Sequence, residues 1–403
     1  MAKLSRGTLS SSGREFLDTS SAVVFAQGTR TVPYHRSLNG VIEQSSHDGM
    51  VFGGHRGMGE NLLALTATGR PLMKYRENTI RSFNTAAAAG ASFVEFDVQV
   101  TRDGIPVIWH DDDVLTLSKQ SDIPQLRRIC DLTLDEFKQL SPAHRSQNGA
   151  AGLPESDDNC SSISEQALPD GDAATDRVDS HAGASTSAAA VPCPALGRVF
   201  NDEQGKRASR PMHWAVSDDD ELPTLAEVFK GVDPSVGFDI EVKMATPSDM
   251  PVTPPQEVDR MVNAILEQVQ AVAMHSSRPI FFSALRQRQS RFPVLLLSTG
   301  GTCWHADERR MSIAAAIAFA LEASLQGLVL DSGAVQQQQP AIAAARSKGL
   351  KVLTYGLQNN EPSWVRYQYT LGIQGAIVDD VAGIISAFGR ASSLKASAPE
   401  IDR

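Results

Sequence analysis

Short apolar segments alternate with helical patterns along most of the chain, and this alternation constrains the fold more than any other feature. The apolar segments are 51–54, 92–98, 105–109, 236–242, 279–283, 294–298, 326–330, 351–355 and 375–378. Helical periodicity lies over 78–89, 133–140, 224–230, 255–273, 311–325 and 340–348, with Gly90 ending the first helix and Thr133 beginning the second. Strands that alternate with helices in this way predict an α/β fold with a parallel sheet.

One connection is too short for a parallel pair. Only residues 101–104, Thr-Arg-Asp-Gly, separate the segments 92–98 and 105–109. Parallel neighbours need a crossover of roughly a dozen residues or more, so this pair is predicted to be an antiparallel hairpin. Eight parallel strands remain, the number that closes a (β/α)8 barrel. Strand counting alone leaves an open doubly wound sheet as the alternative.

Length, charge and cysteine content exclude several classes of protein. The chain has 403 residues, enough for one large domain or two smaller ones, and a formal net charge of −10. That charge argues against a nucleic-acid partner. The four cysteines lack CxxC spacing and therefore suggest neither a disulfide framework nor a zinc site. The longest apolar run, 313–321, is well short of the roughly 20 residues that span a bilayer, so no stable membrane insertion is expected.

Composition divides the chain into a core and three peripheral segments. Residues 141–197 contain no aromatic residue, and their eight acids outnumber two arginines, so we predict a disordered acidic insertion whose deletion leaves the melting temperature nearly unchanged. Residues 1–48 are predicted to form a flexible tail. Within them, residues 1–40 are rich in Ser, Thr, Lys and Arg, which is typical of an organelle transit peptide and equally of a disordered tail. The barrel is expected over 49–390, with a C-terminal tail at 391–403.

The segment FVEFDVQVTRDGIPVIWHD, residues 93–111, concentrates the polar residues most suited to chemistry. Glu95 and Asp97 are two apart on a strand and therefore share one face, within reach of one cation. A two-residue turn at 102–103 would place Glu95 opposite His110, and a turn at 103–104 would place Asp97 there. A strand with one solvated face explains the same alternation and remains an alternative.

Two further groups add cations and a second histidine. In GFDIEVK, Glu241 and Lys243 share one face of a strand end; Glu241 would complete an oxygen-rich site for Mg²⁺ or Ca²⁺, whereas a plain salt bridge is the alternative. In GGHRGMGENLL, His55 can transfer protons near neutral pH, and Arg56 can hold a phosphate. The glycines do not complete GxGxxG, so a nucleotide-binding loop is poorly supported.

Together these motifs resemble the glycerophosphodiester phosphodiesterase family, in particular its plant and green-algal type. The matching residues occur in the family's order: His55-Arg56-Gly57, Glu77-Asn78, Glu95-x-Asp97, His110-Asp111 and Glu241-x-Lys243. The likeness covers roughly residues 50–388 apart from the insertion, and it extends through LPTLAEVF, PIFFSAL, PVLLLSTGG, LQGLVLD, LTYGLQNN and GIQGAIVDD.

The resemblance implies a single (β/α)8 TIM barrel, one divalent metal ion and hydrolysis of glycerophosphodiesters to glycerol 3-phosphate and an alcohol. His55 and His110 would be acid and base, Arg56 and Lys243 would bind phosphate, and Glu95, Asp97 and Glu241 would hold the metal. His110 could instead be a metal ligand. Glu77 and Asn78 would orient Arg56 or the metal ligands, unless Asn78 is simply a helix cap.

Substrate selectivity and rival functions are less constrained. Trp304, His305, Tyr355 and residues 358–360 would lie on barrel loops and could frame the glycerol or head group, or pack in the core. A lysophospholipase D acting on lipid-tailed substrates is the nearest rival, followed by a catalytically silent phosphate-binding protein and, more distantly, a glycosidase. The partner expected is a small glycerophosphodiester. The compartment expected is intracellular and soluble, either cytoplasm or plastid, and oligomeric state is left open.

Overall fold

Eight parallel strands close into a ring at the centre of the molecule. The computed structural model describes residues 50–63, 72–118, 121–141, 195–200, 210–244, 254–273, 280–283, 292–303 and 308–396, and structural statements below refer to these. The strand order is β1-β13-β12-β11-β10-β9-β8-β2, and β2 pairs with β1 to complete the circle. The (β/α)8 barrel is therefore confirmed, and the open sheet is excluded by the β1–β2 pairing.

All nine strands predicted from the apolar segments are present, each within two residues of its expected bounds. The barrel strands are β1 (Val51–Gly54), β2 (Phe93–Val100), β8 (Gly237–Val242), β9 (Ile280–Ser283), β10 (Val294–Ser298), β11 (Gly327–Asp331), β12 (Lys351–Tyr355) and β13 (Gly375–Val378). The ninth, β3 (Pro106–Ile108), pairs antiparallel with β2. Most are apolar on both faces because one side lines the barrel and the other meets helices.

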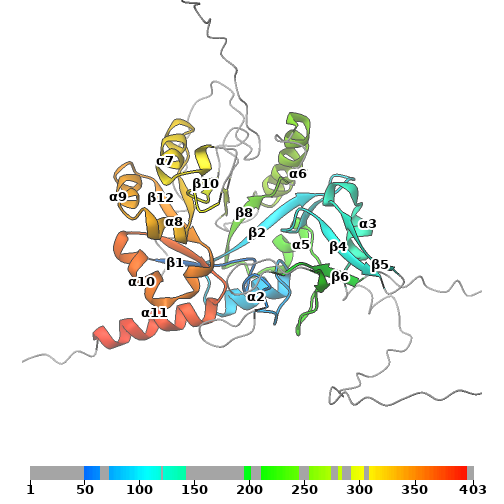
Figure 1. Ribbon diagram of the computed structural model, residues 1–403, viewed down its shortest axis with the longest axis horizontal. Coiled ribbons are helices and arrows are strands. Elements are labelled where there is room, and N and C mark those ends of the chain that lie inside the picture. The colour runs from blue at the N-terminus through cyan, green and yellow to red at the C-terminus, as the bar shows by residue number, and fades with distance from the viewer. Residues whose placement is uncertain are drawn as a thin grey trace, which may run out of the picture.

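Helices surround the strands in Figure 1. They are α2 (Ile80–Ala88), α3 (Leu134–Lys138), α5 (Leu225–Gly231), α6 (Pro255–Ala273), α7 (Ile313–Glu322), α8 (Ser332–Gln337), α9 (Pro340–Ser347), α10 (Pro362–Leu371) and α11 (Val381–Ala396), with short 3₁₀ turns at Ile129–Asp131, Glu308–Arg310 and Leu357–Asn360. Thr133 and Thr224 each form a capping box with a glutamate three residues on, which fixes where α3 and α5 begin.

The core has two layers on either side of the barrel wall. Inside the ring, one cluster contains Val51, Phe93, Leu295, Val329, Leu353 and Ile377. A larger cluster packs the outer faces of the strands against the helices, and it includes Phe52, Phe96, Phe238, Ile265, Ile317 and Val365. The interior is thus filled with side chains, so chemistry is confined to the mouth of the barrel.

The β2–β3 hairpin has a register that neither sequence-based alternative predicted. Val98 pairs with Ile108 and Val100 with Pro106, which leaves a three-residue loop between Thr101 and Ile105. Gly104 takes a positive φ of 85°, the geometry that such a loop requires at its last position. Both predicted registers assumed a two-residue turn and are wrong. His110 lies beyond the end of β3 and reaches the barrel mouth from the segment that follows.

A second, smaller sheet stands beside the barrel. Its order is β5-β4-β6-β7, from β4 (Val114–Ser118), β5 (Ser121–Arg127), β6 (Ala195–Arg198) and β7 (Met212–His213). This accessory sheet lies on the β2 side of the barrel in Figure 1 and has its own apolar cluster, including Trp109, Phe137, Leu196, Phe200 and Trp214. No sequence signal marks β6 and β7, because they are only four and two residues long, and none marks β5, because it is mostly polar and contains Pro124.

Three predicted boundaries need correction. The insertion predicted over 141–197 is too long at both ends, since Ser141 is fully buried and 195–197 belong to β6. The C-terminal tail predicted from 391 is wrong for its first residues, because α11 continues to Ala396. Residues 1–49, 142–194 and 397–403 lie outside the described part of the chain, so the predicted tails and the middle of the insertion are not tested.

Candidate metal and phosphate site at the mouth of the barrel

Three carboxylates from two neighbouring strands meet at the mouth of the barrel. The register of β2 with β8 sets Glu95 beside Asp239 and Asp97 beside Glu241. Oxygens of Glu95, Asp97 and Glu241 all lie within 4.8 Å of one another. Both strands run in the same direction, so period-two spacing on each brings the acids to one spot. These are the three metal ligands expected from the sequence.

The charges of this cluster fit a hard divalent cation. Burial, with Asp97 and Glu241 close by, raises the pKa of Glu95 to about 8. Asp97 is 1% exposed, and its Oδ1 accepts no hydrogen bond among the described residues. A buried carboxylate oxygen without a donor, beside a carboxyl group that resists ionisation, is a set of donors that a cation would satisfy.

His55 follows β1 directly and is held by a buried aspartate. Its Nδ1 lies 2.7 Å from Oδ1 of Asp379, which follows β13, the neighbouring strand. Asp379 also accepts hydrogen bonds from the Glu60 backbone and from Asn360 Nδ2, both at 2.8 Å. Burial and the charge of Arg56 lower the pKa of His55. The charge and hydrogen bond of Asp379, together with the charge of Glu95, outweigh them and raise the pKa to about 9. His55 is therefore a cation at neutral pH in this arrangement.

Arg56 contacts three of the surrounding carboxylates, those of Glu77, Glu95 and Asp97. Its backbone N donates to Glu95 at 3.1 Å, its Nη1 donates to Glu77 at 2.9 Å, and its Nε lies 3.7 Å from Asp97. Gly57 makes this sharp turn possible, because its φ is +95° and a Cβ there would come within 2.3 Å of the Ser82 hydroxyl. The guanidinium is thus fixed within the acid cluster.

Glu77 and Asn78 both reach the site. Asn78 Nδ2 donates to Asp97 Oδ2 at 3.3 Å, and Asn78 has a positive φ of 58°. The cap of α2 is instead Thr79, whose hydroxyl accepts from the Ser82 backbone. The helix-cap alternative for Asn78 is therefore wrong, and Asn78 contacts a predicted metal ligand.

His110 differs from His55 in its electrostatic surroundings. Its Nδ1 lies 2.9 Å from Asp111 Oδ1. Burial, and then the positive charges of Arg56 and Lys243, hold the pKa of His110 well below its usual range. His110 is therefore neutral at pH 7, with Nδ1 facing a carboxylate and Nε2 left for other partners.

One cavity of about 180 Å³ is lined by the residues of the site that carry its central charges, namely His55, Arg56, Glu95, Asp97, His110, Glu241 and Lys243. Lys243 Nζ lies 3.5 Å from Glu241 and 3.7 Å from Asp97. The cavity also contains two polar residues that the sequence did not assign, Asp239 and Arg310, and it contains Tyr355, which was predicted as a residue that could frame the glycerol or head group. Asp239 carries the same period-two signal as Glu95 and Asp97, and Asp379 follows a strand as His55 does, so both were detectable. Arg310 follows a long loop and leaves no such signal.

The other described residues that were predicted to contact the substrate do not line this cavity. Asn359 is fully buried and donates to Thr354 and to the Ile377 carbonyl, so it packs in the wall. Asn360 holds Asp379, and Gln358 accepts from Ser332. Trp304 and His305 lie outside the described residues.

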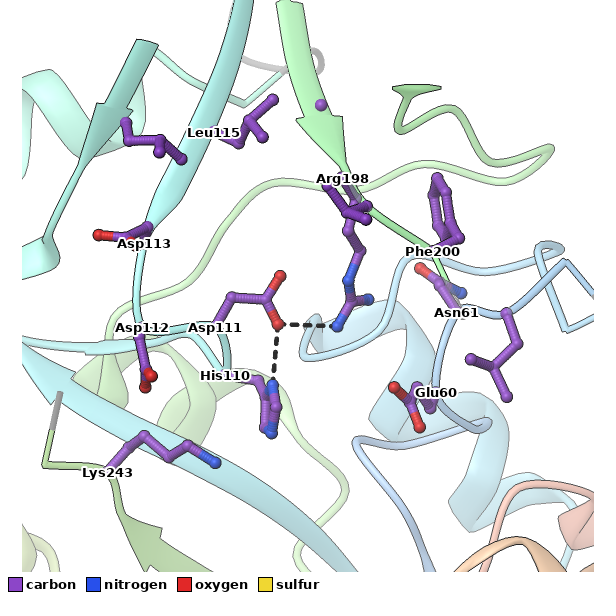
Figure 2. A pocket seen from close by; sticks show the side chains of 14 residues that line it. Glu60, Asn61, His110, Asp111, Asp112, Asp113, Leu115, Arg198, Phe200 and Lys243 are labelled. Carbon is purple, nitrogen blue, oxygen red and sulfur yellow. Dashed lines mark hydrogen bonds and ion pairs between the residues drawn. The ribbon is translucent and has the colours of Figure 1, made fainter. Parts of the chain in front are cut away.

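A second cavity of about 530 Å³ adjoins the first and shares His110 and Lys243 with it. Figure 2 shows Asp111 between His110 and Arg198, with Asp112, Asp113 and Glu60 around the same space. Apolar side chains complete the lining: Leu62, Leu115, Leu126, Val199 and Phe200. The accessory sheet therefore supplies one wall of a groove that leads from the barrel mouth.

Fold and site together define a TIM barrel with a candidate divalent-cation centre, flanked by two histidines and by cationic side chains, at the carboxyl ends of its strands. The chain belongs to the glycerophosphoryl diester phosphodiesterase family, whose model matches residues 55–382.

Comparison with individual proteins agrees. A glycerophosphodiester phosphodiesterase of Arabidopsis thaliana is 32% identical over 84% of this chain and 77% of its own. A glycerophosphocholine phosphodiesterase of Eremothecium gossypii is also 32% identical, over 82% of this chain and 25% of that longer protein. The crystal structure of a glycerophosphodiester phosphodiesterase from Parabacteroides distasonis, 14% identical, has a TM-score of 0.50 and covers 85% of this chain and 98% of that one.

Among the described residues, no helix is both long and apolar enough to cross a membrane.

Proposed function

We propose that the protein hydrolyses glycerophosphodiesters, glycerophosphocholine among them, to sn-glycerol 3-phosphate and an alcohol, with one divalent metal ion. The observation that carries the proposal is the convergence of Glu95, Asp97 and Glu241 within 4.8 Å in a cavity that also contains two histidines and three arginine or lysine side chains. Family membership and the substrates named for both relatives support the same reaction.

The two histidines are suited to opposite proton transfers. His110 is neutral, so its Nε2 can accept the proton of the glycerol hydroxyl next to the ester as that oxygen attacks phosphorus. His55 is held protonated by Asp379 and can donate to the departing alcohol oxygen. The product of this step is a cyclic phosphate. In the second step, water attacks phosphorus while the two histidines exchange roles.

The cations stabilise charge on the phosphoryl oxygens. A divalent ion bound by Glu95, Asp97 and Glu241 would supply Lewis-acid stabilisation of that charge. Lys243 lies at the boundary of the two cavities and can approach an anionic oxygen from there. Arg56 carries positive charge in the same cavity, and its turn is fixed by Gly57.

The departing alcohol is proposed to occupy the second cavity. Asp111 is paired with Arg198, and Lys243 lies near Asp97 and Glu241. Asp112 and Asp113 have no ion pair within 4 Å among the described residues, so the cavity wall carries surplus negative charge near His110. That sign favours a cationic alcohol such as choline over an anionic one.

The direct test is release of glycerol 3-phosphate from glycerophosphocholine by the purified protein. We expect no release after chelation and recovery when Mg²⁺ or Ca²⁺ is restored, and the metal that restores more activity identifies the preferred ion. A folded protein that releases nothing with either ion would overturn the proposal.

The apolar half of the second cavity favours one other candidate, a lipid-tailed substrate. Leu126 is 61% exposed at its edge, and Leu115 lies beside it. Lysophosphatidylcholine cleaved faster than glycerophosphocholine under the same conditions would favour this alternative. The compartment, cytoplasm or plastid, remains a proposal that rests on the composition of residues 1–40, and localisation of the tagged full chain tests it.

A further inference from the structure

Arg198 is a buried arginine from outside the barrel that contacts the catalytic machinery. It ends β6 of the accessory sheet and is 7% exposed. Its Nη1 donates to Glu77 Oε2 at 2.7 Å, and its Nη2 donates to Asp111 Oδ1 at 2.9 Å. The guanidinium lies over the Trp214 ring at 4.6 Å, which fixes its plane.

Each of the two carboxylates that Arg198 holds orients one residue of the site. Asp111 Oδ1, which accepts from Arg198, also lies 2.9 Å from His110 Nδ1, as Figure 2 shows. The second carboxylate, Glu77, accepts from Arg198 through Oε2 and from Arg56 through Oε1. Two short chains of charged hydrogen bonds therefore begin at Arg198. One leads through Asp111 to His110, the proposed base, and the other leads through Glu77 to Arg56.

Because of its geometry, Arg198 cannot be replaced by another cation without losing one of its two hydrogen-bonded carboxylates. A lysine has one ammonium in place of a planar fork and cannot donate to two separated carboxylates along the same directions. Without Arg198, Asp111 can rotate away from His110, and Nδ1 of His110 loses the partner that sets its tautomer. Glu77 would then keep Arg56 and the Asn61 backbone N–H as donors but would lose its second arginine.

We propose that Arg198 is a positioning residue, through which the accessory sheet orients His110 and Arg56 by way of Asp111 and Glu77. The inference rests on the proposed function, since it assigns His110 and Arg56 to the reaction. The accessory sheet is then part of the active site, although none of its strands belongs to the barrel.

The test is steady-state kinetics of Arg198→Gln and Arg198→Lys on glycerophosphocholine with saturating metal. Loss of a hydrogen bond that orients a site residue commonly costs about 10- to 100-fold in activity, and we expect that loss in kcat with KM changed by less than about threefold. Arg198→Lys should recover only a small part of it. Wild-type kcat in either folded variant overturns the proposal.

Arg76 provides a matched control. It is fully buried, its guanidinium lies over the same Trp214 ring at 4.9 Å, and it pairs with a carboxylate, Asp219, but it contacts neither Asp111 nor Glu77 through its side chain. Arg76→Gln should lower the melting temperature while kcat per folded molecule stays within about threefold of wild type. An equal loss of kcat in both arginine variants would show that Arg198 acts only through stability.

A double-mutant cycle separates the proposed route from a general effect. Asp111→Asn is a mild change at a partly exposed residue, so this variant should fold even if Arg198→Gln does not. Because both residues act on His110, the double variant should lose little more than the worse single variant, whereas multiplied losses would overturn the route. An inactive wild type would instead indicate failure of the proposed function.

Discussion

The two histidines share a cavity but have opposite charge states, and this difference predicts how each substitution behaves. His55→Ala and His110→Ala should each lower kcat by about 100-fold or more, because each removes one proton-transfer group. Thermal unfolding should show that His110→Ala stays folded. Turnover near that of wild type in either variant would remove that residue from the mechanism.

Asp379 sets the charge of His55, so its removal should change the pH dependence of the reaction. Burial would then dominate, and the pKa of His55 should fall from about 9 toward or below its ordinary value. In Asp379→Asn, the alkaline limb of kcat against pH should therefore move to lower pH. A profile that superimposes on that of wild type would contradict the role of Asp379.

Asp112 and Asp113 test the choice of alcohol. Two unit charges about 4 Å apart in water interact by about 1 kcal/mol, so each charge removed should cost roughly fivefold. We expect Asp112→Asn with Asp113→Asn to lower kcat/KM for glycerophosphocholine while glycerophosphoglycerol, which has a neutral head group, is nearly unaffected. Glu322→Gln, on α7 and outside the cavity lining, is a control for removal of a single charge elsewhere. Parallel losses for both substrates would refute charge selection.

At the scale of elements, β6 decides how much of the insertion is dispensable. Deletion of 141–197 removes buried Leu196 and displaces Arg198, whereas the sequence predicted almost no change in melting temperature. Loss of a buried leucine side chain costs about 2–5 kcal/mol, so we expect a drop of at least roughly 5 °C. A shorter deletion of 150–185 is the control. Equal melting temperatures for both deletions would show that β6 contributes little.

The barrel strands could be predicted from sequence because each is an apolar run bounded by turn residues. The same rule placed Glu95, Asp97, Glu241 and His55, since parallel strands bring their carboxyl ends together. It missed Arg198, which comes from a four-residue strand far along the chain, and it misplaced the hairpin register. One residue more in the turn shifts every pair, and composition does not fix loop length.

At the scale of the whole molecule, metal binding should stabilise the fold increasingly as pH rises. The pKa of Glu95 is raised from 4.5 to about 8, so between these values the metal-free folded state holds a proton that the unfolded state releases. Stability without metal therefore falls as pH rises through this window. Bound metal displaces that proton, so the gain in melting temperature should be larger at pH 8 than at pH 6.

Thermal unfolding with and without Mg²⁺ or Ca²⁺ at both pH values measures this effect. Glu95→Gln has no such proton to lose and should show a small, pH-independent gain. A wild-type gain that is equal at the two pH values, or larger at pH 6, would contradict the assignment of Glu95 as a ligand.

Residues of the candidate site contribute to the contacts that join β1 to β2. The two strands share only two residue pairs, Gly53 with Phe93 and Gly54 with Val94. Just beyond them the Arg56 backbone N–H donates to Glu95, and Arg56 Nε lies 3.7 Å from Asp97. The residues proposed to carry out hydrolysis therefore also hold β1 and β2 together, through the Arg56 backbone to Glu95 and through the Arg56 side chain to Asp97. Active sites usually trade stability for activity, but here replacing Arg56 should weaken both. A related protein that had lost the activity could still be selected to keep these residues, because they stabilise the barrel. Their retention in evolution would therefore not by itself indicate an enzyme.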